Sequence, residues 1–194
     1  MLRSGSSFGE VSLSSQLEGF QIFAGYNRWM NLKISECCAK LSEEELLKNR
    51  KSFFPSILGN LNHILLGDLI WLTRISSDRS LLKFLSNLPT FEFKGLDELR
   101  HRKLDSYKVE RELIDHIILD FIDRLEIDSL SQTISYKTTG GQEFNNPLWL
   151  ILTHLFNHQT HHRGQISTLL NQDGHDLGST DFVYYNRFVH KTLA

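Results

Sequence analysis

Four histidines, His154, His158, His161 and His162, stand within nine consecutive positions near the end of the chain. In a helix, residues four apart lie about 40° apart around the axis and ~6 Å apart along it. His158 and His162 therefore present two imidazoles on one side, the spacing with which paired histidines of zinc peptidases reach one ion. The pair favours a divalent-metal site; the alternative is a set of hydrogen-bonded histidines without a metal.

The apolar residues around these histidines indicate which of them face inward. The expected buried stripe consists of Leu148, Leu152, Leu155, Ile166 and Leu169. His162 falls near the centre of this stripe and His158 on its flank, whereas His154 and His161 fall further round the helix. We predict that His158 and His162 point into the protein, and that His161 is exposed or contacts a second copy.

A divalent ion needs at least a third protein ligand, with an open position for water at a catalytic site. The candidates elsewhere in the chain are His63, Asp68, His101 and His116. His63 lies about 120° from the centre of the apolar stripe of its own predicted helix. Periodicity therefore does not favour His63 over Asp68 as the third ligand. Gly59 and Gly67, one turn to either side of His63, would leave room for a cleft.

Asp68 lies in the middle of that apolar stripe, and a buried carboxylate needs a partner. It either orients a metal ligand or pairs with an arginine such as Arg163. Gln165 leans to the same side as His158 and is either a lining residue of the pocket or helix packing. A general base would have to be Asp68, His154 or a loop residue, because Gln159 follows His158 where zinc peptidases carry glutamate.

Hydrophobic periodicity predicts four long helices to position these residues, over 16–40, 55–74, 95–125 and 148–171. Ser42 with Glu45 predicts a capping box. Residues 132–145 alternate around Gly140 and Gly141, which predicts a β-hairpin before the last long helix. The expected fold is an all-α four-helix bundle with one small hairpin, in which residues 1–14 form a flexible lead-in and residues 15–194 one domain.

The composition excludes several classes of protein. The chain has 194 residues, 40% of them apolar, and a net charge of −2, so it lacks the basic excess of a nucleic-acid binder. No stretch reaches the ~18 apolar residues of a membrane span, and the polar N-terminus lacks a signal sequence. We therefore expect a cytoplasmic protein without a membrane partner, in which the adjacent Cys37 and Cys38 are reduced core thiols.

Three segments, 26–34 (YNRWMNLKI), 61–74 (LNHILLGDLIWLTR) and 157–174 (NHQTHHRGQISTLLNQDG), resemble the signature regions of the DinB/YfiT-like family. Their order and the later GSTDF (178–182) also match. The resemblance implies a four-helix bundle with one divalent ion, zinc or nickel, at one end of the core. Its ligands would be His63, His158 and His162, and the protein would be a homodimer.

Relatives in this family resemble thiol-dependent transferases and isomerases that use low-molecular-weight thiols, or metal-dependent hydrolases. The resemblance therefore implies an enzyme acting on a small molecule, although it identifies no catalytic residue. Two alternatives remain: a metal-binding stress-response protein without catalysis, and a helical scaffold whose histidines bind no metal. His158 and His162 follow from helical geometry as well as resemblance, whereas His63 follows from resemblance alone.

Overall fold

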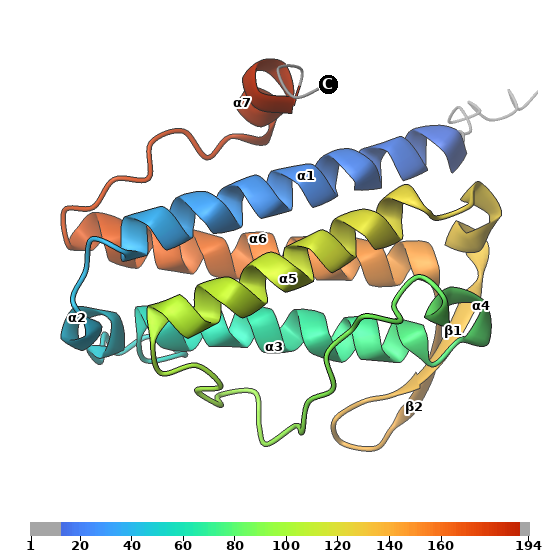
Figure 1. Ribbon diagram of the computed structural model, residues 1–194, viewed down its shortest axis with the longest axis horizontal. Helices are drawn as coiled ribbons and strands as arrows, with labels where there is room; N and C mark the ends of the chain where they lie inside the picture. The colour runs from blue at the N-terminus through green and yellow to red at the C-terminus, as the bar shows by residue number, and fades with distance from the viewer. Residues whose placement is uncertain (1–12, 191–194) are drawn as a thin grey trace, which may run out of the picture.

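Four long helices make up most of the computed structural model, which describes residues 13–190 (Figure 1). They are α1 (Leu13–Cys38), α3 (Ile57–Ser76), α5 (Leu104–Asp123) and α6 (Leu148–Gln172). The shorter elements are α2 (Glu43–Leu47), α4 (Arg79–Leu82), the 3-10 helix η1 (Ile127–Ser131), the strands β1 (Thr133–Lys137) and β2 (Glu143–Pro147), α7 (Phe182–Tyr185) and the π-helix η2 (Asn186–His190). Most of the predicted lead-in, residues 1–12, lies outside the described residues, and its last two residues belong to α1.

The long helices share one apolar core. Both α1 and α3 pack against α5 and α6 (Figure 1). The apolar face of α1 is buried at Tyr26, Met30, Ile34 and Cys37, whereas Phe23 is 37% exposed. Cys37 and Cys38 are both buried free thiols, as predicted. None of the helices within residues 13–190 is long and apolar enough to span a membrane.

Local capping signals determine where two helices begin. The Ser42 side chain accepts from the backbone of Glu45, whose carboxylate accepts from the Ser42 N–H, so the predicted capping box of α2 is confirmed. At α3, Ser56 provides the cap, with its hydroxyl 3.0 Å from the Gly59 nitrogen. The helix therefore starts two residues later than predicted.

The third predicted helix, 95–125, is wrong in its first part, because α5 starts only at Leu104. Gly95 has a φ of +154°, which a helix does not allow. The His101 backbone is tied to α3 on both sides: its N–H donates to Asn62 Oδ1 (2.7 Å) and its carbonyl accepts from Asn62 Nδ2 (2.9 Å). These bonds replace helical ones, so residues 83–103 form a long connection along α3.

The predicted hairpin is confirmed immediately before α6. β1 and β2 pair antiparallel, with Thr133 opposite Pro147 and Lys137 opposite Glu143. Gly141 in the turn has a φ of +84°, which glycine adopts without strain. The Leu148 N–H then donates to the Gln132 carbonyl (2.8 Å), which joins the start of α6 to the start of the hairpin.

The C-terminal segment packs against α1 (Figure 1). The Tyr26 hydroxyl donates to the Thr180 carbonyl (2.7 Å), and Lys33 Nζ donates to the Ser179 carbonyl (2.6 Å). Of the aromatic side chains in this segment, Tyr185 is buried, whereas Tyr184 and Phe188 are exposed.

Candidate metal centre

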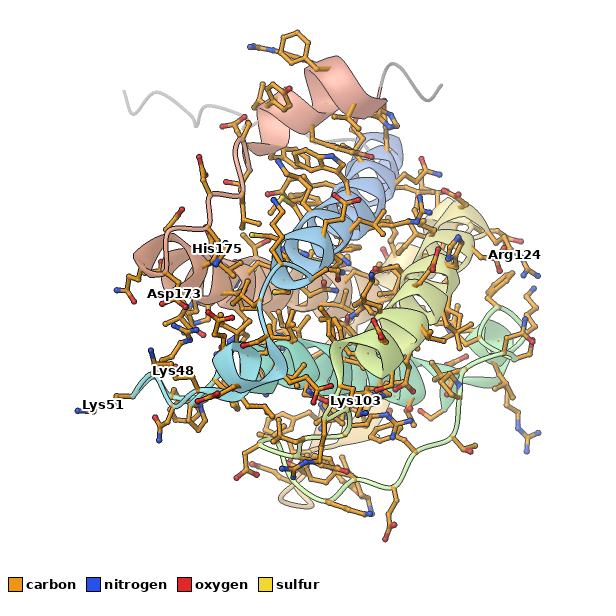
Figure 2. The ribbon with its side chains drawn as sticks, turned by 60° about the vertical axis from the view of Figure 1, so that its left-hand side comes forward. Lys48, Lys51, Lys103, Arg124, Asp173 and His175 are labelled. Atoms are coloured by element: carbon orange, nitrogen blue, oxygen red, sulfur yellow. The ribbon has the colours of Figure 1, made fainter. Side chains whose placement is uncertain are left out.

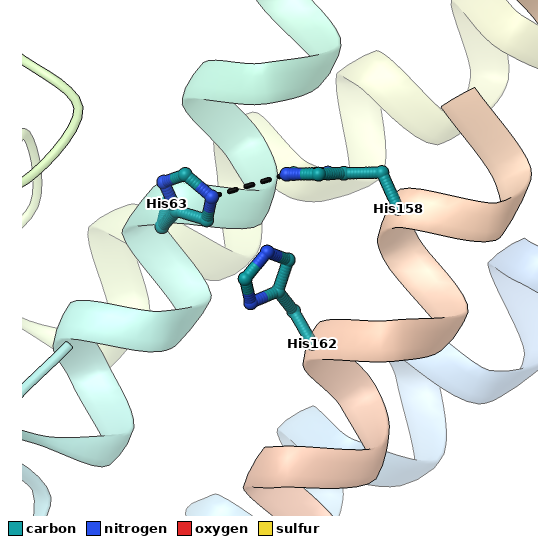
Figure 3. Close-up of side chains that lie close together, drawn as sticks. All are labelled: His63, His158 and His162. Atoms are coloured by element: carbon teal, nitrogen blue, oxygen red, sulfur yellow. Dashed lines mark hydrogen bonds between the residues drawn. The ribbon is translucent and has the colours of Figure 1, made fainter. Parts of the chain in front are cut away.

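The side chains of His63, His158 and His162 meet between α3 and α6 (Figure 3). One ring nitrogen from each residue lies within 4.8 Å of the other two, and no other group of three or more metal-ligating side chains of this kind occurs within residues 13–190. His63 Nε2 is 3.1 Å from His158 Nε2, and the ring centroids of His158 and His162 are 4.4 Å apart. The structure thus brings together residues 95 positions apart in the chain.

Hydrogen bonds to the outer ring nitrogens orient two of these rings. His63 Nδ1 lies 3.0 Å from the Leu96 carbonyl, which only accepts, so Nδ1 carries the proton and Nε2 keeps its lone pair. His162 Nδ1 lies 2.9 Å from Gln165 Oε1, which also only accepts, so Nδ1 of His162 carries the proton and its Nε2 keeps a lone pair. Both residues therefore present Nε2 lone pairs as donors toward a common point.

The surroundings keep the three imidazoles uncharged near neutral pH. Burial lowers the pKa of His63 and of His162, and the neighbouring histidines add to the effect. Burial, followed by the proximity of His162 and His63, lowers the pKa of His158 to about 3. Neutral imidazole is the form that binds metals.

This arrangement fits a divalent ion. Two Nε2 lone pairs that face each other at 3.1 Å repel unless a proton or a cation lies between them. Nitrogen ligands at ~2.05 Å from a tetrahedral zinc ion are about 3.3 Å apart, close to the observed separation. Three neutral nitrogen donors suit zinc, nickel or copper better than magnesium or calcium, which prefer oxygen ligands.

Two connecting segments, which the sequence did not link to the site, cover His63. The Phe54 ring stacks on the His63 ring at a centroid distance of 3.8 Å, and residues 83–103 supply the Leu96 carbonyl. An ion pair between Arg50 and Asp173 ties the Phe54 segment to the end of α6. Figure 2 shows Asp173 beside Lys48 on that side of the molecule.

Gly67 makes room for His158. A Cβ added at Gly67 would lie 2.9 Å from His158 Cε1, closer than side chains pack. Gly59, the other glycine that flanks His63, is close only to Ser56 and Phe54. Of the two glycines expected to leave room beside His63, Gly67 leaves room that the His158 ring fills, and Gly59 does not contact the cluster.

Asp68 contacts none of the three histidines and pairs with Arg111 instead of Arg163. Its Oδ2 lies 2.5 Å from Arg111 Nη1, and its Oδ1 accepts from Gln159 Nε2 (2.9 Å). Arg111 also lies 3.0 Å from Asp115. The position of Asp68 in the apolar stripe correctly predicted that it points inward. The stripe could not show that the cation paired with it comes from α5.

Arg163 joins the same buried polar network from its other side. It donates to Asn27 and to Gln159 Oε1 (3.1 Å), and Asn31 bonds to Asp115 (2.9 Å). Two arginines and two aspartates balance the charge, which is how a core tolerates ions. Burial raises the pKa of Asp68 to about 6, although Arg111 opposes that rise.

Three further residues near the cluster differ in their contacts. His154 stacks on His158 at 5.8 Å and contacts Trp71. Gln165 bonds to the His162 ring, so it belongs to the surroundings of the site and is not mere packing. His161 is exposed, as predicted, and bonds only to Gln165 among the hydrogen-bond partners that the described residues provide.

The fold and this cluster define a helical protein with three converging histidines on two long helices. The model of the DinB family matches residues 14–191, so the chain belongs to that family. It is also similar to Protein DinB of Bacillus subtilis (strain 168), with 29% identity over 168 residues that cover 86% of this chain and 92% of that protein.

Proposed function

We propose that the four long helices form a four-helix bundle whose trihistidine cluster holds zinc or nickel, and that the protein is a metal-dependent enzyme acting on a small molecule, by transfer to a thiol or by hydrolysis. The observation that carries the proposal is the convergence of three neutral imidazoles, two of them with their Nε2 lone pairs oriented by outer hydrogen bonds.

A divalent ion held by neutral ligands retains its full charge and lowers the pKa of a thiol or water bound in its open position, producing a nucleophile near pH 7. The protein's part is to hold the ligands. Leu96 and Gln165 orient the His63 and His162 rings, and Phe54 excludes water from one side of the cluster.

His154 is the proton acceptor that this proposal favours. It lies next to His158 and contacts Trp71, and partial burial together with nearby Arg74 lowers its pKa, so it is neutral at pH 7. Asp68 is unsuitable, because both carboxylate oxygens are bonded in the core. Gln159 bonds to Asp68 as well, so this position points away from the histidines, and a peptidase mechanism is not favoured.

The test combines metal analysis with turnover of the purified protein. We expect one equivalent of bound zinc or nickel, and conjugation of 1-chloro-2,4-dinitrobenzene with at least one thiol of a panel. In that reaction a sulfur–carbon bond forms, chloride leaves and the thiol proton passes to His154 and then to solvent. Hydrolysis of 4-nitrophenyl acetate without thiol tests the hydrolytic route.

His63→Ala should lose both metal and turnover at least 100-fold while it remains folded, because two imidazoles do not hold an ion tightly. His161→Ala is the matched control, because it removes an exposed histidine from the same helix. Absence of bound metal in the wild type would overturn the proposal. Bound metal without turnover of any substrate would favour the second candidate, a metal-binding protein without catalysis.

A further inference from the structure

A row of aromatic rings leads away from the trihistidine cluster along α3 and α6. His154 stacks on His158 with ring centroids 5.8 Å apart, and Trp71 lies 4.9 Å from His154. Tyr136 of β1 continues the row, 5.1 Å from Trp71. Flat side chains thus connect the candidate metal centre to the hairpin.

Two cavities follow this row. The first, of about 400 Å³, is lined by Trp71, Tyr136, Asn146, Leu150, Ile151 and His154. The second, of about 500 Å³, lies between the end of α3 and the hairpin, where Arg74, Ser77, Ser135 and Asn145 supply polar groups. Tyr136 lines both, so the cavities adjoin at its ring. Volumes of this size accommodate a small organic molecule.

Arg74 is the unusual residue of the second cavity. Its guanidinium lies over the rings of Trp71 (4.5 Å) and Tyr136 (5.1 Å), yet no carboxylate of residues 13–190 forms an ion pair with it. Lys137 and Glu143, which also line this cavity, form an ion pair at 3.1 Å, so their charges cancel. The cavity therefore keeps one uncompensated positive charge.

The guanidinium of Arg74 lies over these two rings without a carboxylate partner among residues 13–190. The planar fork of N–H groups that a guanidinium carries matches a carboxylate or sulfonate. Arg100 and Arg124 also lie over aromatic rings, but each bonds to a carboxylate, Glu110 and Asp120 respectively. Arg74 differs from these two arginines because no carboxylate of the described residues pairs with it.

We propose that these adjoining cavities bind a small anionic molecule with a flat body, whose carboxylate or sulfonate pairs with Arg74 and whose rings or conjugated atoms lie against Trp71 and Tyr136. Arg74 stands eleven residues after His63, about 16 Å along the helix axis. An extended ligand anchored at Arg74 would reach toward the histidines. This orientation rests on the proposed function, whereas the anion site itself does not.

The test uses 8-anilinonaphthalene-1-sulfonate, and its neutral counterpart N-phenyl-1-naphthylamine, with metal-free protein. Fluorescence titration should show that Arg74→Gln weakens binding of the sulfonate about tenfold, since a charge-assisted hydrogen bond contributes ~1.5 kcal/mol or more. Binding of the neutral probe should change less than twofold. Arg74→Lys, which keeps the charge, should recover part of the affinity and guards against a loss caused by misfolding.

Arg124→Gln is the matched control, because it removes an arginine that lies over Phe84 but already has Asp120 as its partner. It should leave both affinities unchanged. Equal sulfonate binding by wild type and Arg74→Gln, or an equal loss in Arg124→Gln, would overturn the proposal. His63→Ala should bind the sulfonate like wild type, so failure of the metal site and failure of the anion site give different results.

Discussion

At Gly67, a missing side chain decides the position of a candidate ligand. The His158 ring occupies the space in which a Cβ would stand, 2.9 Å from Cε1 and 3.3 Å from Nδ1. The atoms that would have to move belong to a residue of the trihistidine cluster. Substitution here therefore tests the site itself without removing any of its donors.

We expect Gly67→Ala to weaken zinc or nickel binding about tenfold or more, the usual effect of disturbing the support of a ligand. Isothermal titration with each metal measures it. Gly164→Ala on α6 is the control, because its Cβ would meet nothing within 4 Å and should stabilise the helix by up to ~1 kcal/mol. Unchanged affinity in Gly67→Ala would show that the His158 position is irrelevant to metal binding.

At the scale of elements, the buried polar network determines how the long helices face one another. Asn27 and Asn31 come from α1, Asp68 from α3, Arg111 and Asp115 from α5, and Gln159 and Arg163 from α6. Gln159 and Arg163 each follow a histidine of the cluster directly in sequence. The network therefore restricts the rotation of α6 about its axis, which keeps His158 and His162 directed toward α3.

Arg111→Met should lower the free energy of unfolding by about 3–5 kcal/mol, because it leaves Asp68 and Asp115 buried without their cation. Urea denaturation followed by circular dichroism measures the change. Arg124→Met breaks an exposed pair with Asp120 at the end of the same helix and should cost no more than ~0.5 kcal/mol. Similar losses in the two variants would mean that the buried network contributes no more than a surface ion pair.

At the scale of the whole molecule, the proposed metal binding would be coupled to folding, because the three donors come from helices that meet only in the folded chain. An unfolded chain offers at best the local pair on α6. An ion that binds the folded state alone stabilises it in proportion to the logarithm of its concentration, by ~2.7 kcal/mol at 100 times its Kd.

For a chain of this size, zinc or nickel at that concentration should raise the Tm by about 5–10 °C. Differential scanning fluorimetry of protein first stripped with chelator measures the shift. Magnesium should have no effect, because it prefers oxygen ligands, and His63→Ala should remove the response. A similar rise in His63→Ala would show that the ion binds elsewhere.

Local patterns in the sequence were enough to predict the helices, the hairpin and the α2 capping box. They depend on hydrogen bonds and side-chain spacing within a few residues, which a single segment contains. The inward direction of His158 and His162 follows from the same 3.6-residue period. The extension of the third helix to residue 95 failed, because contacts with Asn62 of another helix replace the helical bonds there.

Helical periodicity did not place His63 beside the other two histidines and did not give the partner of Asp68. The family resemblance named His63, and only the tertiary structure shows how it meets His158 and His162. A helical wheel places residues relative to one apolar stripe, but α3 is buried on most of its circumference and has no single stripe. His63 could therefore lie far from the apolar centre and still meet His158 and His162. The partner of Asp68 depends equally on which helix packs opposite. The paired histidines were thus determined by sequence, whereas the third member of the cluster was determined by the packing of α3 against α6.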